Sequence, residues 1–385
     1  MIVVAAVVLG AWGYLLLLHG RFWRAGPVLE AAMGGLGAAD GASLIRATRG
    51  AVTPVDVVVP ARDEAATIED TLRSLLAQDY GGALRVILVD DRSADGTGAL
   101  ARAIGDERLV VIDGAERPAG WSGKLWAVEQ GVARSTAPFI LLTDADIVHD
   151  PAHVATLVAE AERDGLDLVS EMVALRAVSL AERALVPAFV YFFQMLYPFN
   201  LVNDPSTRVA AAAGGTMLVR RAALERIGGI DSLRGALIDD VTLAARIKQG
   251  GAIYLGHSGL ARSLRPYPGA ADIWRMVART AYVQLRLSPV LLLGTVLGLV
   301  LIWLMPPWLA LFGHGAARWM GAVAWAGSAM SFVPTLRRFG QSPAWALGLP
   351  AIATFYLLAT IGSAVDYHRG RGVVWKGRSY QEIES

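Results

Sequence analysis

The stretch Phe139-Ile-Leu-Leu-Thr-Asp144-Ala-Asp146-Ile-Val decides the fold that we expect for this chain. Its apolar run predicts a buried strand, and the run ends in two carboxylates two residues apart. Such residues point the same way in an extended chain, so Asp144 and Asp146 are expected to face one ligand. Paired carboxylates suit a hard divalent cation that keeps phosphate oxygens as further ligands. The alternative is that Asp144 lies in a turn and Asp146 caps the next helix.

Two similar strands precede this stretch. Residues 55–59 are mostly valine and end in Pro60-Ala-Arg62-Asp63-Glu64, and helical spacing follows over residues 65–78. Residues 85–89 predict a second strand, which ends in Asp90-Asp91. A further helix to about Gly105 and a third strand over residues 109–112 complete the pattern.

Alternating strands and helices predict an α/β domain with a parallel sheet. In such sheets a ligand lies beyond the carboxyl ends of the strands. The polar clusters at residues 60–64, 90–91 and 144–146 therefore predict one shared binding site. The alternative for any single cluster is a helix cap.

Composition excludes several classes of protein. The chain has 385 residues, of which 54% are hydrophobic, and that share exceeds the value for ordinary soluble domains. A net charge of +1 provides no basic field for nucleic acid. The absence of cysteine excludes disulfides, thiolate metal sites and a cysteine nucleophile.

The apolar residues concentrate at the two ends of the chain. Residues 2–18 carry no charge, so we expect an N-terminal membrane anchor over residues 1–24, with residues 25–51 as a linker. A cleaved signal peptide is the alternative, but no basic region precedes the run. Arg21 and Arg24 favour a cytoplasmic location for the domain that follows.

Residues 289–366 predict C-terminal transmembrane helices, with candidate spans at 291–311, 321–333 and 344–365. The first is interrupted by Pro306-Pro307. Residues 367–385 form a basic tail that prefers the cytoplasm, which four simple spans do not allow. One segment is therefore expected to be re-entrant or interfacial. Residues 181–203 are apolar but interrupted, and predict an interfacial helix or an ordinary core helix.

Three further segments carry candidate chemistry. Lys124 follows Gly123, and its ammonium could meet a phosphate, although a lone lysine is usually only solvated. Gly214-Gly215-Thr216 lies in a run of small residues that permits close approach to the backbone. Asp239-Asp240 precedes a helical pattern, where the pair is either catalytic or a double N-cap.

In their order along the chain, the segments resemble family 2 inverting glycosyltransferases, which have a Rossmann-like GT-A fold and use nucleotide-sugar donors. The resemblance covers roughly residues 52–285, and we place the domain at residues 52–288. The membrane segments and residues 375–380 make the chain most similar to the hopene-associated branch. Two departures are an Asp at position 239 in place of Glu, and the absence of the Gln and Trp of a Gln-x-x-Arg-Trp motif near Arg279.

The resemblance implies a role for each matching residue. Donor-binding residues would be Pro60, Ala61, Arg62, Glu64, Asp90, Asp91, Lys124, Asp144, Asp146 and Arg279. Asp146, Asp144 and His257 would bind Mg²⁺ or Mn²⁺, although a lone histidine is more often structural. Gly214, Gly215 and Thr216 would bind the acceptor, and Asp240, with Asp239, would be catalytic.

We therefore expect a membrane-bound inverting glycosyltransferase, a hexosyltransferase of family 2. It would move a single sugar from a nucleotide-sugar donor, above all a UDP-sugar, to a lipid acceptor, with Asp240 as base. The expected location is the inner (plasma) membrane, as a multi-pass protein whose catalytic domain is cytoplasmic. The alternatives are a membrane transporter and a non-catalytic nucleotide-binding scaffold; the C-terminal spans contain few of the polar groups that transport requires.

Overall fold

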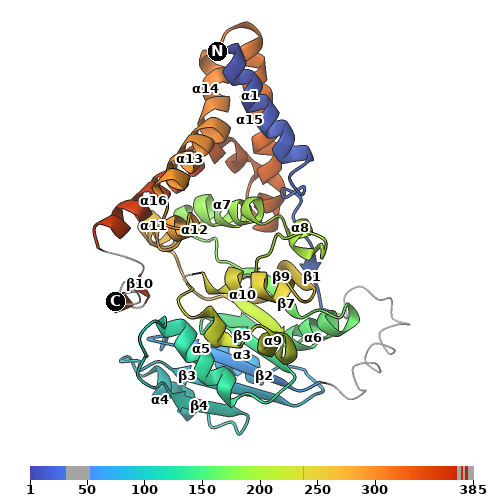
Figure 1. Cartoon of the computed structure of the whole chain (residues 1–385), viewed down its shortest axis with the longest axis vertical. Coiled ribbons are helices and arrows are strands. Elements are labelled where there is room, and N and C mark those ends of the chain that lie inside the picture. The colour runs from blue at the N-terminus through green and yellow to red at the C-terminus, as the bar shows by residue number, and fades with distance from the viewer. Residues whose placement is uncertain (32–52, 237, 371–373, 376–377, 380–385) are drawn as a thin grey trace. The chain divides into compact units, whose positions relative to one another are not determined.

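The computed structural model describes residues 1–31, 53–236, 238–370, 374–375 and 378–379 (Figure 1). The chain divides into two compact units. The sheet unit comprises Pro27–Leu175, Val202–Arg265 and Val374–Ser385, and the helical unit comprises Met1–Gly26, Arg176–Leu201 and Pro266–Val373. Most of the predicted linker at residues 25–51 lies outside the described residues. The division differs from the predicted domain bounds, because residues 176–201 and 266–288 group with the apolar helices.

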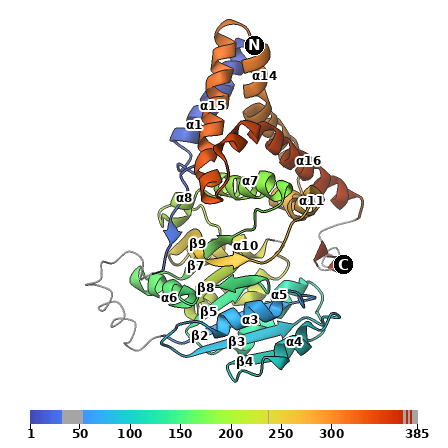
Figure 2. The same cartoon turned by 180° about the vertical axis from the view of Figure 1, so that it is seen from behind.

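The described part of the sheet unit contains a nine-stranded sheet in the order β1-β9-β7-β8-β5-β2-β3-β4, with β6 paired to β9. The strands are β1 (Val28–Leu29), β2 (Val55–Ala61), β3 (Leu84–Asp90), β4 (Leu109–Asp113), β5 (Phe139–Thr143), β6 (Ile147–His149), β7 (Leu168–Ala174), β8 (Thr216–Arg220) and β9 (Ile253–Ser263). The four strands predicted from the sequence are present as β2, β3, β4 and β5, and these run parallel to one another (Figure 2). The sheet is nevertheless mixed, because β8 pairs antiparallel with both β5 and β7.

Helices cover both faces of the sheet, so the central strands are apolar on both sides. Val57, Ile87 and Leu141 are fully buried, as expected of parallel strands enclosed by helices. The helices of this unit are α3 (Ile68–Leu76), α4 (Thr97–Ala103), α5 (Gly123–Arg134), α6 (His153–Arg163), α9 (Arg221–Arg226), the 3₁₀ helix η1 (Ile230–Leu233) and α10 (Asp239–Lys248). Helix α8 (Phe199–Asn203) spans the boundary between the two units. Helix α10 begins at Asp239, where the sequence predicts a helix start.

The helical unit contains α1 (Ile2–Leu17), α7 (Leu180–Leu196), α11 (Ala270–Ala278), α12 (Ala281–Gln284), α13 (Pro289–Leu299), the π-helix η2 (Val300–Leu304), α14 (Met305–Phe312), α15 (Gly315–Arg338), the 3₁₀ helix η3 (Pro343–Gly348) and α16 (Leu349–His368). Among the described residues, two helical segments are long and apolar enough to cross a membrane, namely Pro289–Phe312 and Pro343–His368. Helix α1 is apolar but shorter.

The candidate span at residues 291–311 is continuous in spite of Pro306-Pro307. A π-helical turn at Val300–Leu304 ends two residues before Pro306, and local π-helical adjustments can satisfy the backbone groups that a proline leaves free. The predicted span at residues 321–333 is part of the longer helix α15, which does not have the composition of a candidate span.

Helix α7 corresponds to the segment that the sequence left open between an interfacial helix and a core helix. It begins with a capping box in which Ser179 and Glu182 exchange hydrogen bonds. Its Tyr191 hydroxyl lies 2.6 Å from Ser331 Oγ, and its Leu185 carbonyl accepts a 2.8 Å hydrogen bond from the Tyr356 hydroxyl. These buried contacts to α15 and α16 favour the core-helix interpretation.

Candidate functional site

A pocket in the sheet unit lies at the carboxyl ends of β2 and β5, as the parallel-strand pattern predicts. Its other walls come from α5, η1, α10 and the start of β8. The lining residues are Pro60, Lys124, Leu125, Val128, Leu142, Thr143, Asp144, Gly214, Met217, Ile230, Leu233, Asp239 and Leu243. Five of these residues were predicted from the sequence as donor-binding, acceptor-binding or catalytic: Pro60, Lys124, Asp144, Gly214 and Asp239.

Lys124 is the cation of this pocket. Ser122 caps α5 by accepting a 3.2 Å hydrogen bond from the Leu125 N–H, which places Lys124 in the first turn of the helix. Lys124 Nζ lies 2.8 Å from Asp144 Oδ1 and 3.9 Å from Asp239 Oδ2. Burial alone would lower the pKa of Lys124, but the two carboxylates raise it above its ordinary value. The lysine therefore stays charged, as a phosphate-binding group requires.

Asp240 is held by backbone groups beside this lysine. Its Oδ2 accepts a 2.9 Å hydrogen bond from the Gly214 N–H, and its Oδ1 accepts a 2.8 Å bond from the Val241 N–H. Burial and the neighbouring Asp239 charge raise the pKa of Asp240 to about 6, against the opposing effect of Lys124. The sequence predicted close approach at Gly214, and a Cβ there would stand 3.2 Å from Asp240 Oδ2.

Asp144 and Asp146 bind different partners. Strand β5 ends at Thr143 and β6 begins at Ile147, so residues 144–146 form a turn. The expectation that an extended backbone aims both carboxylates at one ligand is therefore wrong. Asp144 contacts Lys124, whereas Asp146 Oδ2 accepts a 2.6 Å hydrogen bond from Arg265 Nε.

Arg265 is a site residue that the sequence analysis missed. It joins Asp146 to Glu64, whose Oε1 accepts a 2.9 Å bond from Arg265 Nη2. Arg265 follows the end of β9, which the sequence analysis did not predict as a strand. The available signal was a basic residue in the polar stretch Arg262-Ser-Leu-Arg265, which follows a mostly apolar run.

The turns after β2 and β3 are joined to each other, as the prediction of one shared site requires. Arg62 Nη1 donates a 2.5 Å bond to the Asp91 carbonyl and lies 3.7 Å from the buried Asp91 Oδ2. The Glu64 N–H donates to Thr97 Oγ1 at 2.9 Å. Asp90 Oδ1 accepts a 3.0 Å bond from the Ser93 N–H, so in this structure it orders the turn. Ala61, the last residue of β2, pairs in register with Asp90.

The remaining predicted residues lie apart from the lining of the pocket. Thr216 is fully buried at the start of β8, opposite Thr143 of β5. His257 is buried in β9, in register with Val28 and Met172. Arg279 belongs to the helical unit, at the C-terminal cap of α11, and its predicted contact with a diphosphate stays a prediction.

Asp144 and Asp146, the carboxylates predicted to bind a divalent cation, have other partners in this structure. The carboxylates of Asp144 and Asp146 are the hard oxygen donors that Mg²⁺ and Mn²⁺ prefer, but each is paired with a cationic side chain. Within the described ranges, no group of three or more His, Cys, Asp or Glu residues is arranged to hold a metal ion. The predicted set of Asp144, Asp146 and His257 is therefore not assembled here.

The mixed α/β sheet with a pocket at its strand ends has the arrangement of the Rossmann-like GT-A fold. A similar solved structure is the mannosyltransferase PcManGT from Pyrobaculum calidifontis, in complex with GDP-Man and Mn²⁺. The match has a TM-score of 0.56 at 21% identity and covers 94% of this chain and 98% of that one, so it shows the fold.

Residues 56–228, a little under half of the chain, match the family described as glycosyl transferase family 2. Succinoglycan biosynthesis protein ExoO of Rhizobium meliloti (strain 1021) is 34% identical over 35% of this chain and 40% of that protein. The 4,4'-diaponeurosporenoate glycosyltransferase of Staphylococcus aureus (strain MRSA252) is 34% identical over 24% of this chain and 23% of that protein. The chain thus matches less than half the length of either relative.

Proposed function

We propose that this chain is a membrane-bound inverting glycosyltransferase that moves a single sugar from a nucleotide-sugar donor to a lipid acceptor. The observation that carries the proposal is the setting of Asp240. Its carboxylate is fixed by the Gly214 N–H, and its pKa is raised to about 6, beside the charged Lys124. A base whose pKa lies near the working pH is both ionised and basic enough to accept a proton.

In the proposed reaction, Asp240 accepts the proton of the acceptor hydroxyl as the oxygen attacks the anomeric carbon. The bond from that carbon to the nucleoside diphosphate breaks on the opposite face of the sugar, so the configuration inverts. Lys124 lines the pocket with Asp239, the residue before Asp240, and would stabilise the negative charge that develops on the diphosphate. The transfer is complete after one displacement, without a covalent enzyme intermediate.

Several features support a nucleotide-sugar donor. The Pro60–Glu64 and Asp90–Asp91 turns lie together and would accept the nucleoside, with Lys124 toward the phosphates. The structurally similar mannosyltransferase is in complex with GDP-Man and Mn²⁺. For this chain a UDP-sugar and a requirement for Mg²⁺ or Mn²⁺ remain proposals. No step above depends on a metal, because Asp144 and Asp146 are paired with Lys124 and Arg265.

A lipid acceptor is supported by the helical unit. The segments Pro289–Phe312 and Pro343–His368 have the length and composition to cross a membrane. One relative acts, by its name, on 4,4'-diaponeurosporenoate. An acceptor too insoluble to leave the bilayer requires an enzyme that is anchored there. We propose the inner membrane, with several spans, a cytoplasmic catalytic domain and a hopanoid-related acceptor.

The test uses the full chain purified in lipid nanodiscs, with a panel of labelled nucleotide sugars and extracted membrane lipids. Asp240→Asn is expected to lower kcat by about a hundredfold or more, the usual contribution of a general base. Asp164→Asn is the matched control, because Asp164 is half-exposed, pairs with Arg163 at the end of α6 and does not line the pocket. NMR of the product should show an inverted anomeric centre. Wild-type turnover in Asp240→Asn, or retained configuration, would refute the proposal.

A further inference from the structure

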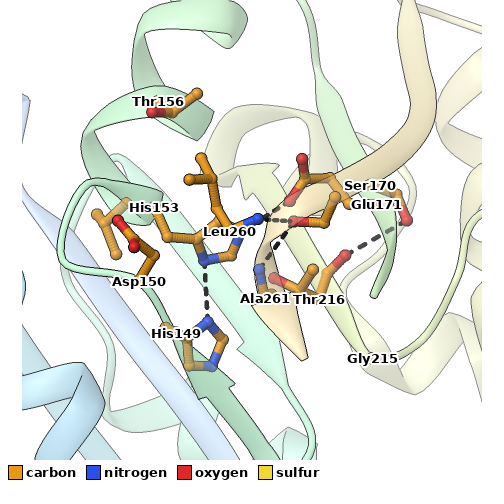
Figure 3. A network of polar contacts seen from close by, with 12 residues as sticks. His149, Asp150, His153, Thr156, Ser170, Glu171, Gly215, Thr216, Leu260 and Ala261 are labelled. Carbon is orange, nitrogen blue, oxygen red and sulfur yellow. Dashed lines mark hydrogen bonds and ion pairs between the residues drawn. The ribbon is translucent and has the colours of Figure 1, made fainter. Parts of the chain in front are cut away.

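A hydrogen-bonded series of buried polar side chains runs from Thr143, which lines the pocket, into the interior of the sheet unit. Figure 3 shows its part from His149 through His153 to Glu171. Thr143 Oγ1 lies 3.2 Å from His149 Nε2, and His149 Nδ1 lies 2.9 Å from His153 Nδ1. His153 Nε2 in turn lies 2.8 Å from Glu171 Oε2. All four side chains are at most 3% exposed. Buried polar groups destabilise a fold unless their hydrogen bonds are made, so the direction of each bond matters.

The direction of the first links follows from the number of available protons. The Thr143 hydroxyl donates a 2.9 Å hydrogen bond to the Gly215 carbonyl, which can only accept. Its single proton is then used, so His149 Nε2 must donate to Thr143 Oγ1. Burial and the neighbouring His153 hold the pKa of His149 well below its ordinary value. A neutral imidazole carries one N–H, so His149 Nδ1 accepts from the His153 Nδ1–H.

The last link must hold one more proton, between His153 Nε2 and Glu171 Oε2. Either His153 is an imidazolium that donates to a carboxylate, or a neutral Glu171 donates to a neutral His153. Both arrangements have zero net charge. Glu171 Oε1 has no hydrogen-bond partner within the part of the chain that the structure describes. A carboxylate left without the shared proton would therefore be both buried and poorly paired, which is costly.

The Thr143 end of this hydrogen-bonded series reaches the backbone that holds Asp240. Thr143 binds the Gly215 carbonyl from one side. Ser170, next to Glu171 on β7, accepts a 2.8 Å bond from the Ala213 N–H on the other side. Between these two anchors, the Gly214 N–H donates to Asp240. The backbone is thus held at Ala213 and at Gly215, on either side of the Gly214 N–H that binds the Asp240 carboxylate.

We propose that His149, His153 and Glu171 are positioning residues, which direct the Thr143 hydroxyl to the Gly215 carbonyl and so hold the backbone that binds Asp240. The proposal rests on the proposed function, in which Asp240 is the base. With the Thr143 hydroxyl turned toward His149 instead, the Gly215 carbonyl would keep only the longer 3.3 Å bond from the Asp144 N–H.

The first test compares Thr143→Val with Thr143→Ser. The valine removes the hydroxyl at nearly constant shape and is expected to lower kcat about tenfold without changing the donor KM. That factor corresponds to about 1.4 kcal/mol, within the range for a buried hydrogen bond. The serine keeps the hydroxyl and should restore kcat. Thr156→Val is the control, because Thr156 is also buried but donates to the carbonyl of Ala152, the N-cap of its own helix α6.

The second comparison is Glu171→Gln with Glu171→Leu. A glutamine amide can donate to an unprotonated His153 Nε2. Glu171→Gln therefore keeps the direction of every hydrogen bond in the series and should retain kcat. Leucine cannot donate, and about a tenfold loss of kcat is expected. A loss in Thr143→Val or Glu171→Leu no larger than that in Thr156→Val would overturn the proposal.

A measurement on the wild-type chain is independent of activity and of variant folding. Long-range ¹H–¹⁵N spectra of the histidine-labelled full chain should show His149 protonated at Nε2 and His153 protonated at Nδ1. The opposite tautomer of His149 would overturn the proposal. If the wild-type chain turns over no nucleotide sugar, the proposed function fails, and the histidine spectrum then supports or overturns the hydrogen-bond direction by itself.

Discussion

Replacing Asp239 with Asn is expected to move the acidic limb of the pH–rate profile to lower pH. The pKa of Asp240 is raised from 3.8 to about 6, first by burial and then by the Asp239 charge. At 1.36 kcal/mol per pH unit, that rise corresponds to about 3 kcal/mol against the ionised form. Since the proposed base works only when ionised, activity should fall as the pH drops through about 6.

Asp239→Asn removes the like charge but leaves the burial. A neighbouring charge commonly contributes about 1 pH unit to a carboxyl pKa, so the limb should move to about pH 5. Lys124→Met removes the opposing cation, which lowers the pKa of Asp240 in the wild type. The limb should then move up by about 1 pH unit. The two variants are therefore expected to shift in opposite directions.

The assay is kcat/KM for the donor between pH 4.5 and 8.5, roughly the span that brackets both shifts, at constant ionic strength. Far-UV circular dichroism at each pH confirms that the chain stays folded. Asp240→Asn lacks the carboxyl group that titrates, so its pH–rate profile is the reference for the other variants. A limb that does not move in Asp239→Asn, or that moves in the same direction in both variants, would refute the reasoning.

Three further predictions concern the supporting structure. Asp56→Asn should lower the free energy of unfolding by about 2 kcal/mol at pH 7, because hydrogen bonds from Arg85 and from backbone N–H groups outweigh burial and lower the pKa of Asp56 to about 2. Denaturant titrations should show this difference at pH 7, where Asp56 is ionised in both states, and its progressive loss as the pH falls below 3.8 through about 2. Gly131→Ala should destabilise by about 1–3 kcal/mol, because its Cβ would lie 2.4 Å from Val58, whereas Gly259→Ala meets nothing within 4 Å; thermal melts compare the two. Arg265→Met should lower stability by about 1–3 kcal/mol in the same melts, because it leaves two carboxylates without their cation, and an unchanged melting temperature would contradict this.

Much of the sheet could be predicted from the sequence. Strands β2, β3 and β5 are short runs of valine, isoleucine and leucine that end in polar residues, and each lies where its pattern predicts. Local pattern is sufficient here because strands buried on both faces need apolar residues throughout. The start of α10 at Asp239 was predictable from the helical spacing that follows it, although the N-cap position is Ile238 and no side chain caps this helix, so the double N-cap alternative is wrong.

The antiparallel strand β8 and the strand β9 could not be predicted in this way. Strand β8 inserts between β5 and β7, and its pairing partners lie some distance away in sequence. In sequence, residues 176–201 come between two parts of the sheet unit, but they group with the apolar helices. For this segment, composition alone did not distinguish a core helix from an interfacial helix, because both kinds of helix are rich in apolar residues.

The sequence by itself determined which residue types stand at the strand ends: the acidic turns, the lysine at the start of α5 and the Asp239-Asp240 pair. Only the tertiary structure decided which charges meet. Asp144 turns to Lys124, and Asp146 turns to Arg265, a partner 119 residues away. The physical reason is that a strand's period is set by neighbouring residues, whereas an ion pair depends on two turns that the whole sheet must first bring together.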